Sequence, residues 1–256
     1  MRPADELHAN VEAYLRSIAF APDLGGLEEP LRYALDGGGK RIRPVLCLAV
    51  TEAAGGEPIA ALPAAAAIEL VHTFSLVHDD LPALDDDAER RGRPTVHVAF
   101  GEGVAILAGD ALLAEAFRLA LGYDDPAIAR ELVDATLGMI GGQYRDIAGD
   151  DADLERLQRL KTGRLFRAAV ALGVRVAGVP EVEHAPWRAF GDDTGLLFQA
   201  VDDILDGDGY VRRDGIEAAG RVAAEAAERA RARVDTLPGD VSVLRALVDS
   251  VASRTG

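Results

Sequence analysis

The chain has 256 residues, 49% of them hydrophobic, so it can bury a large core. Its formal net charge of −16 argues against a nucleic-acid-binding protein, which usually carries a basic patch. The single cysteine, Cys47, excludes an internal disulfide and fits a reducing compartment, so we expect a cytoplasmic protein.

Helix-forming residues dominate the chain, and strand-like alternation of polar and apolar residues is scarce. No run of about eighteen apolar residues predicts a membrane span, and the N-terminus lacks the apolar core of a signal peptide. Glycine and proline divide the sequence into segments of helical length. We therefore predict an all-α bundle in a single domain, residues 1–256, with helices at about 4–19, 25–36, 43–55, 58–80, 93–98, 102–121, 125–146, 151–177, 182–206, 214–235 and 240–253.

Some of these helices have clear boundary signals. Gly37–Gly39 can end the second helix in a left-handed conformation, and Asp124 or Asp125 can cap a helix that has Pro126 at its first position. The segment 58–80 is apolar nearly all round, which predicts a buried central helix.

Five aspartates lie close together at the end of this apolar segment: Asp79, Asp80, Asp85, Asp86 and Asp87. Their mutual repulsion and the helix dipole oppose such a cluster, so it is either a solvated charge run or a site where a cation compensates the charge. Mg²⁺ prefers carboxylate oxygens together with substrate phosphates. Asp79 and Asp85 do not share a face of a straight helix, but Pro82 can interrupt the helix and return Asp85 to the side of Asp79.

A second acidic cluster follows another apolar helical segment. Asp202 and Asp206 are four residues apart and share a helix face, with Asp203 beside them. One DDxxD motif is a modest signal. Two aspartate-rich helix ends, far apart in the sequence, predict carboxylates that face each other across a cavity and hold metal ions between them. Such ions would explain how a strongly acidic chain binds an anionic substrate.

Cationic side chains occur in two short motifs. The chain has only two lysines, Lys40 in GGGKRIRP and Lys161 in LKTG, which indicates that a compact positive charge is needed at these positions. The first motif presents Arg41, Arg43 and backbone N–H groups to an anion, or it is a tight turn with solvated charges. His72 is equally well explained as a packed core residue. We interpret three further polar residues as structural: Glu69, His78 and Asp110.

Together, the motifs GGGKRIRP, LVHDDLPALDDDAERRG, GGQYRD, LKTG and FQAVDDILD resemble the trans-prenyltransferases, most closely the bacterial farnesyl diphosphate synthases. The resemblance covers about residues 25–206. It implies an isoprenoid-synthase-type helical bundle around a deep central apolar cavity, a homodimer, and isoprenoid diphosphates as substrates. It also implies Mg²⁺ as the cofactor, with three ions when the allylic diphosphate is bound.

The resemblance also implies roles for the matching side chains. The Mg²⁺ ligands would be Asp79, Asp85 and Asp202. The residues implied to act in catalysis are these three together with Asp80, Asp203 and Lys161. Isopentenyl diphosphate would be held by Lys40, Arg43, His72 and Arg91. The allylic diphosphate would contact Arg90, Lys161, Thr162 and Gln199.

The implied reaction joins isopentenyl diphosphate to dimethylallyl or geranyl diphosphate, giving farnesyl diphosphate and pyrophosphate. Phe74, with Ser75 beside it, would form the floor that limits product length, unless Phe74 is an ordinary core residue. Alternatives are the same reaction with geranyl or geranylgeranyl diphosphate as product, and a non-catalytic partner subunit of a heteromeric synthase. A terpene cyclase needs no site for a second diphosphate, so Lys40 and Arg43 argue against it.

After Asp206 the sequence departs from the family pattern. The family usually continues with a lysine-containing loop that closes over the allylic diphosphate. This chain has no lysine there and is shorter by some twenty residues, so Arg212 and Arg213 are the candidates to replace the missing lysines. We therefore expect an atypical, shortened region after residue 206.

Overall fold

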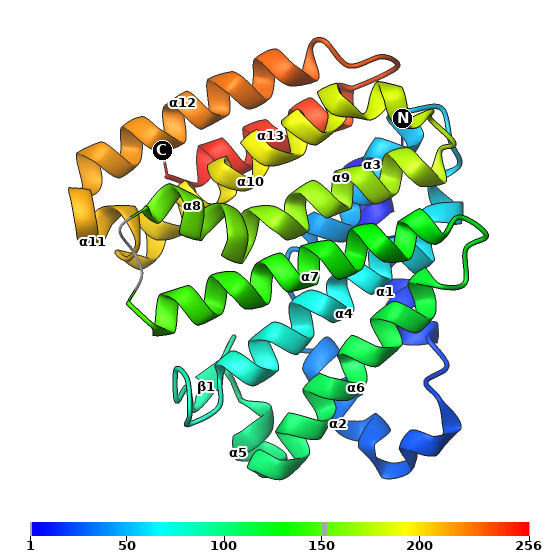
Figure 1. Ribbon diagram of the computed structural model, residues 1–256, viewed down its shortest axis with the longest axis vertical. Coiled ribbons are helices and arrows are strands. Elements are labelled where there is room, and N and C mark those ends of the chain that lie inside the picture. The colour runs from blue at the N-terminus through cyan, green and yellow to red at the C-terminus, as the bar shows by residue number, and fades with distance from the viewer. Residues whose placement is uncertain (1, 150–152, 256) are drawn as a thin grey trace.

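Helices make up most of the chain in the computed structural model, which describes residues 2–149 and 153–255 (Figure 1). The predicted all-α fold class is confirmed. In chain order, the α-helices are α1 (Ala4–Ser17), α2 (Glu28–Leu35), α3 (Ile42–Ala53), α4 (Leu62–Asp79), α5 (Val96–Phe100), α6 (Glu102–Ala120), α7 (Pro126–Ile147), α8 (Leu154–Gln158), α9 (Arg164–Val176), α10 (His184–Asp206), α11 (Tyr210–Asp214), α12 (Ile216–Val234) and α13 (Ser242–Ala252).

Short elements connect these helices. One antiparallel hairpin pairs β1 (Glu89–Arg90) with β2 (Arg93–Pro94). The remaining elements are single turns of tighter or wider helix: η1 (Pro22–Leu27), η2 (Pro58–Ala61), η3 (Arg159–Gly163), η4 (Glu181–Glu183) and η5 (Ser253–Thr255).

Helix α4 lies at the centre of the bundle and packs against α3, α6 and α9. Its run of four buried alanines, 64–67, has little side-chain bulk, so neighbouring helices can approach closely. By length and composition alone, Pro58–Asp79 could cross a membrane. However, 61% of its most apolar window is buried inside the protein, as in the core helix predicted from the sequence.

Helix α10 is the second central helix and packs against α9 and α12. Trp187, Phe190 and Leu197 bury its inner face. In Figure 1, α4 and α10 both end on the left side of the bundle. The two aspartate clusters therefore lie at the same end of the molecule, although they are far apart in the sequence.

Several local predictions are confirmed. Asp125 caps α7 by accepting a hydrogen bond from the N–H of Ala127, with Pro126 at the first helical position. Gly38, three residues after the end of α2, has a left-handed φ of 73°.

Three elements differ from the prediction. The short helix expected at 93–98 is instead the β1–β2 hairpin followed by α5, because a left-handed turn at Arg91 and Gly92 folds the chain back. The helix expected at 151–177 starts outside the described residues and contains the wider π turn η3. Helix α11 was not predicted as a separate element.

Candidate functional site

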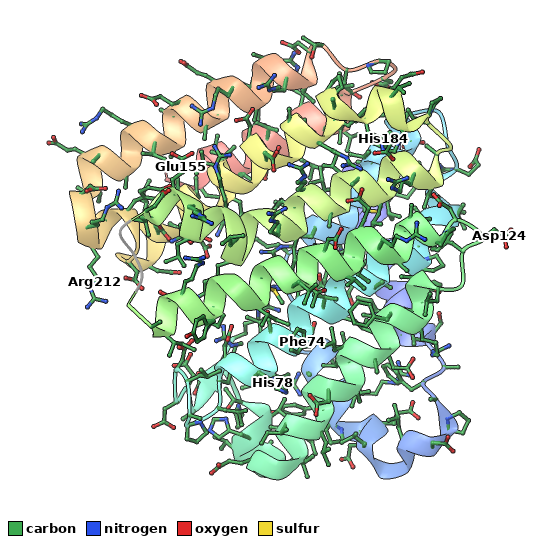
Figure 2. The ribbon with its side chains drawn as sticks, viewed as in Figure 1. Phe74, His78, Asp124, Glu155, His184 and Arg212 are labelled. Atoms are coloured by element: carbon green, nitrogen blue, oxygen red, sulfur yellow. The ribbon has the colours of Figure 1, made fainter. Side chains whose placement is uncertain are left out.

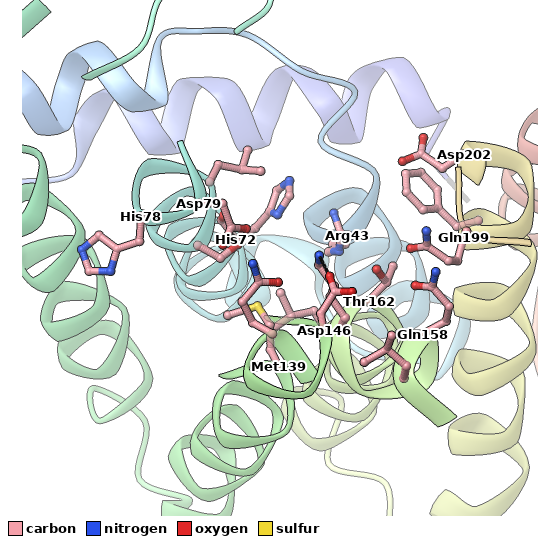
Figure 3. Close-up of a pocket in the computed structure, with 18 of the residues that line it drawn as sticks. Arg43, His72, His78, Asp79, Met139, Asp146, Gln158, Thr162, Gln199 and Asp202 are labelled. Carbon is pink, nitrogen blue, oxygen red and sulfur yellow. Dashed lines mark hydrogen bonds and ion pairs between the residues drawn. The ribbon is translucent and has the colours of Figure 1, made fainter. Parts of the chain in front are cut away.

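A cavity of about 1420 Å³ opens at the end of the bundle where α4 and α10 end. Side chains from α3, α4, α6, α7, η3, α10 and the C-terminal segment line it. Figure 3 shows Asp79 and Asp202 on opposite sides of this cavity, with Arg43 between them. The predicted arrangement, in which the two acidic clusters face each other across one space, is therefore present.

Asp79 is the last residue of α4, and its carboxylate lines the cavity. Burial raises its pKa to about 6; Lys161 opposes this effect, and the neighbouring carboxylates of Asp85 and Asp80 add to it. The backbone N–H of Asp85 bonds to the carbonyl oxygen of Asp79 at 2.9 Å. A turn after the helix end, rather than a bulge within the helix, thus brings the main chain of Asp85 back to Asp79, but Asp85 is exposed and does not line the cavity.

Asp80 does not point into this cavity. It is 3% exposed, and its Oδ1 accepts a hydrogen bond from Arg90 Nε at 2.7 Å. Because successive residues at a helix end point in different directions, only Asp79 of this pair can face the cavity. Asp80 was predicted to act in catalysis. In the structure its carboxylate instead holds Arg90, and with it the β1–β2 hairpin, against α4.

The second cluster differs from the first, because both Asp202 and Asp203 line the cavity. Asp202 lines the cavity, and its pKa is raised by burial and by the nearby carboxylate of Asp206. Asp203 is buried and accepts hydrogen bonds from Gln199 Nε2 at 2.5 Å and from the N–H of Tyr210 at 2.9 Å. Gly209 has a φ of 50° and leaves no room for a side chain beside the Asp203 carboxylate. Asp203 therefore anchors the start of α11.

Arg43 is a buried cation with its hydrogen-bonding capacity unfilled. It is 8% exposed, and its guanidinium stacks 4.7 Å from the Phe166 ring centroid and 5.4 Å from that of Phe198. Among the described residues, no group accepts a hydrogen bond from its Nε. Burial lowers its pKa to about 10, so it stays protonated at neutral pH. A buried charge with an unpaired donor on a cavity wall is suited to an anion.

Other predicted substrate-binding residues surround Arg43. Lys40, Arg91 and His72 all line the cavity. The Arg91 guanidinium donates a hydrogen bond to the carbonyl oxygen of Gly38, which holds it against the glycine turn that carries Lys40. Burial and the surrounding arginines hold the pKa of His72 well below its ordinary value, so its imidazole is neutral. This side of the cavity is therefore cationic.

Lys161 and Thr162 reach the cavity from the π turn η3. Lys161 Nζ lies 2.6 Å from Asp146 Oδ2 on α7. Gly142 on α7 allows the backbone of the turn to pack closely, since a side chain there would collide with Lys161. The π turn thus presents two consecutive polar residues, 161 and 162, to the same cavity. The periodicity of a regular α-helix does not predict this arrangement.

Arg254 lines the cavity and was not predicted from the sequence. Its guanidinium lies 5.6 Å from the Phe198 ring centroid and 3.7 Å from Asp202 Oδ1, and its buried NH1 has no hydrogen-bond partner among the described residues. A single arginine near the end of the sequence carries no motif, so only the three-dimensional packing of α13 against α10 identifies it.

Deeper in the cavity the lining becomes apolar. Phe74 is buried, lines the wall, and packs edge-to-face on His78 at 5.3 Å between ring centroids. Ser75 also lines the cavity and donates its hydroxyl to the carbonyl oxygen of His72. Met139 adds a flexible apolar side chain from α7.

All three residues interpreted as structural line the cavity, with His78 packed against Phe74 and Asp110 4.0 Å from His78. The third, Glu69, lies near the cationic end of the cavity, where its carboxylate is paired with Arg41 NH1 at 2.5 Å.

The carboxylates fit a cation that is shared with a ligand. Among the described residues, no three histidine, cysteine, aspartate or glutamate side chains lie close enough together to hold a metal ion by themselves. Asp79 and Asp202 nevertheless lie on opposite walls, and burial raises the pKa of both despite nearby cations, so additional positive charge would stabilise each carboxylate. The donor set of oxygens, spread around an open space, suits Mg²⁺ bound partly by phosphate oxygens.

Residues 25–215 match the family described as polyprenyl synthetase. A farnesyl diphosphate synthase of Geobacillus stearothermophilus is 41% identical over 204 residues, which are 74% of this chain and 69% of that protein. A geranylgeranyl diphosphate synthase of Cyanophora paradoxa is 45% identical over 193 residues, which are 70% of this chain and 64% of that protein. The match therefore spans less than two thirds of the Cyanophora protein.

Among solved structures, an FPP/GFPP synthase of Zymomonas mobilis superposes with a TM-score of 0.85 and 32% identity. The superposition covers 98% of this chain and 97% of that one. The whole bundle, including α12 and α13 beyond residue 215, thus has a counterpart in a solved relative.

Proposed function

Because the chain belongs to the polyprenyl synthetase family, we propose that it condenses isopentenyl diphosphate with dimethylallyl or geranyl diphosphate to give farnesyl diphosphate and pyrophosphate. One observation carries this proposal. A single cavity has acidic side chains on two walls, unpaired buried cations beside them, and an apolar interior. Such a space fits two diphosphate head groups with hydrocarbon tails.

The allylic diphosphate fits between Asp79 and Asp202. These two carboxylates, with Asp85 beside the first, would hold Mg²⁺, which on binding would neutralise the diphosphate and make it a better leaving group. Lys161 and Thr162 approach the same space from η3 and supply a cation and a hydroxyl donor. Arg212 and Arg213 line the outer edge of the cavity, where they are placed to contact the same diphosphate.

The second diphosphate fits the cationic wall. Arg43 offers an unpaired donor, and Lys40 and Arg91 line the cavity at the glycine turn. Neutral His72 can donate one hydrogen bond without adding charge. Arg254 also lies against Phe198, and its NH1 has no hydrogen-bond partner among the described residues. These contacts orient the carbon–carbon double bond toward the allylic carbon.

The reaction then follows from position and charge. The bond between the allylic carbon and its diphosphate oxygen breaks, and the electron pair leaves with the diphosphate. The double bond of isopentenyl diphosphate supplies electrons for the new carbon–carbon bond. A proton lost from the neighbouring carbon to the departed diphosphate restores a double bond. No protein nucleophile is required. Water must be kept from the allylic cation, and the apolar interior of the cavity serves to exclude it.

The proposed fifteen-carbon product length depends on Phe74. Phe74 precedes Asp79 by five residues, which is roughly 7.5 Å along a helix. Its ring lies on the cavity wall and is braced by His78, so it can stop a growing chain. Relatives with farnesyl and geranylgeranyl products are both similar to this chain, so the wall of this cavity must decide the product length.

The test is a product assay with purified protein, Mg²⁺, labelled isopentenyl diphosphate and one allylic starter at a time. Dimethylallyl and geranyl diphosphate should both give a fifteen-carbon product, and EDTA should abolish it. A twenty-carbon product would overturn the length assignment alone. No product from dimethylallyl, geranyl or farnesyl diphosphate would overturn the catalytic assignment and favour a partner subunit of a heteromeric synthase.

A further inference from the structure

The glycine turn before α3 is held from inside the bundle by the side chain of Arg41. Each nitrogen of its guanidinium donates a hydrogen bond. Nε donates to Glu12 Oε1 at 2.7 Å, and NH1 donates to Glu69 Oε1 at 2.5 Å. The third nitrogen, NH2, donates to the carbonyl oxygen of Leu35. The side chain is only 3% exposed, so these contacts form a buried network.

Arg41 and Arg43 therefore differ in what they can bind. Among the described residues, no group accepts a hydrogen bond from Nε of Arg43, which leaves that donor for a ligand. Every nitrogen of Arg41 already has an acceptor within the protein. An arginine whose donors are engaged in this way fixes the protein groups that it joins.

The acceptors of Arg41 come from three different helices. Glu12 lies on α1, Leu35 is the last residue of α2, and Glu69 lies on α4. Arg41 itself is the N-cap residue of α3. One side chain thus ties four helices to a single point of the backbone. Because Glu12 precedes residues 25–215, the anchor includes a segment outside the match to the family.

The backbone of Arg41 shows why the turn needs an anchor. Its φ of 45° lies in the left-handed region, which residues other than glycine adopt infrequently. Such a conformation persists where the surrounding structure holds it. Lys40 and Arg43 flank Arg41 in the sequence, and both line the cavity. A change in the backbone angles of Arg41 would therefore move Lys40 relative to Arg43.

The network also controls a negative charge beside the cationic wall. Glu69 lines the cavity from α4, the helix on which Figure 2 labels Phe74 five residues later. Burial lowers the pKa of Arg43 and of Arg91, and the negative charge of Glu69 opposes this effect. An unpaired carboxylate at this place would repel a diphosphate. Its ion pair with Arg41 offsets that repulsion.

We propose that Arg41 is a positioning residue for the diphosphate that binds the cationic wall. Its bonds to Glu12 and Glu69 fix the turn before α3. Lys40 and Arg43 are thereby held in place to contact one diphosphate together. The inference rests on the proposed function, because its ligand is the isopentenyl diphosphate assigned to this wall.

The first experiment measures binding without turnover, by calorimetric titration of isopentenyl diphosphate in the absence of an allylic starter. Glu12 does not line the cavity, so a change there reaches the ligand only through Arg41. Glu12→Ala should weaken binding about 5-fold, with unchanged helical circular dichroism. Unchanged affinity in this variant would overturn the proposal.

Arg16→Gln is the matched control for this titration. Arg16 NH1 lies 3.6 Å from the other carboxylate oxygen of Glu12, and Arg16 is exposed on the surface. Its loss leaves the bond between Glu12 and Arg41 in place, so this variant should bind isopentenyl diphosphate as the wild type does. Equal weakening in Arg16→Gln and Glu12→Ala would overturn the role of Arg41.

The second experiment separates geometry from charge. Arg41→Lys keeps the positive charge, but one ammonium group cannot reach acceptors on three helices at once. This variant should raise the KM for isopentenyl diphosphate about 10-fold and leave the KM for the allylic starter nearly unchanged. Wild-type kinetics in a folded Arg41→Lys variant would overturn the proposal. If that variant does not fold, the titration of Glu12→Ala decides.

The third experiment asks whether the network acts through Lys40. Lys40→Met and Glu12→Ala are titrated with isopentenyl diphosphate separately and together. If Arg41 works by placing Lys40, the combined loss of affinity should be smaller than the product of the two separate losses. Losses that multiply would overturn the proposal, and so would a wild-type chain that does not bind isopentenyl diphosphate. Binding to the wild type without any turnover would overturn the proposed function alone.

Discussion

Asp85 bonds through its backbone N–H to the carbonyl oxygen of Asp79, across a turn that closes at the end of α4. This main-chain hydrogen bond keeps Asp85 near the end of α4, where its exposed carboxylate still acts electrostatically on Asp79. Their proximity raises the pKa of Asp79 further than burial alone, so the cavity wall holds a concentrated negative charge ahead of any ligand. Two predictions depend directly on this arrangement.

The first prediction concerns activity. Asp79→Ala and Asp202→Ala should each reduce condensation more than about 100-fold, because each removes one of the two facing carboxylates that hold Mg²⁺ and phosphate. Circular dichroism should show that both variants remain folded. The control is Asp86→Asn, which removes a carboxylate of the same run that does not line the cavity and retains a residue tolerant of the left-handed φ of 54°. Near-normal turnover of either alanine variant would rule out the metal assignment.

The second prediction concerns stability without metal. Because burial raises the pKa of Asp79 from its ordinary value of 3.8 to about 6 in the folded chain, the folded state binds the proton more tightly. The cost of burying this charge is fully present above pH 6 and is relieved as the pH falls toward 4. Asp79→Asn in EDTA should therefore stabilise the protein at pH 7.5, by about 1–2 kcal/mol after screening by solvent.

Thermal unfolding of the variant and the wild type at several pH values checks this second prediction. The difference in melting temperature should be a few degrees at pH 7.5 and should shrink by pH 4.5. A difference in melting temperature that does not change with pH would show that ionisation of Asp79 does not destabilise the folded protein.

The sequence predicts the parts of this site that depend on local pattern. The apolar segment before Asp79 and the four-residue spacing of Asp202 and Asp206 were enough to predict two acidic helix ends facing one cavity. It could not predict that Asp80 turns away to bind Arg90, because that depends on where the chain goes after Pro82. Nor could it predict Arg254, which reaches Phe198 only through the packing of α13 on α10. Contacts between distant segments have no signature in a single sequence.

The third prediction follows from Arg254. Its buried NH1 has no partner among the described residues, so a substrate phosphate is the acceptor that would satisfy it. Arg254→Met keeps the packing on Phe198 and removes the charge-assisted hydrogen bond. The KM for isopentenyl diphosphate should rise about 10-fold, the size expected for one such bond, with little change in the KM for the allylic starter.

Initial-rate kinetics with each substrate varied in turn would measure this effect. Arg245→Met is the matched control, since Arg245 belongs to the same C-terminal region but is paired with Asp235 outside the cavity. An equal loss in both variants, or a selective loss for the allylic substrate, would contradict the placement of Arg254 beside the second diphosphate.

The fourth prediction concerns product length. Phe74→Ala removes a ring from the cavity wall and leaves space toward His78, so the product should lengthen from fifteen to twenty or more carbons. Because the side chain is only 7% exposed, the variant should also lose about 3 kcal/mol of stability. Chromatographic sizing of the products at a temperature well below the melting point separates the two effects. Phe100→Ala, whose ring packs on Tyr33 away from the cavity, should leave product length unchanged. If Phe74→Ala still yields only fifteen carbons, the product is stopped elsewhere, and two other apolar residues of the cavity lining, Leu113 on α6 and Met139 on α7, become the next positions to vary.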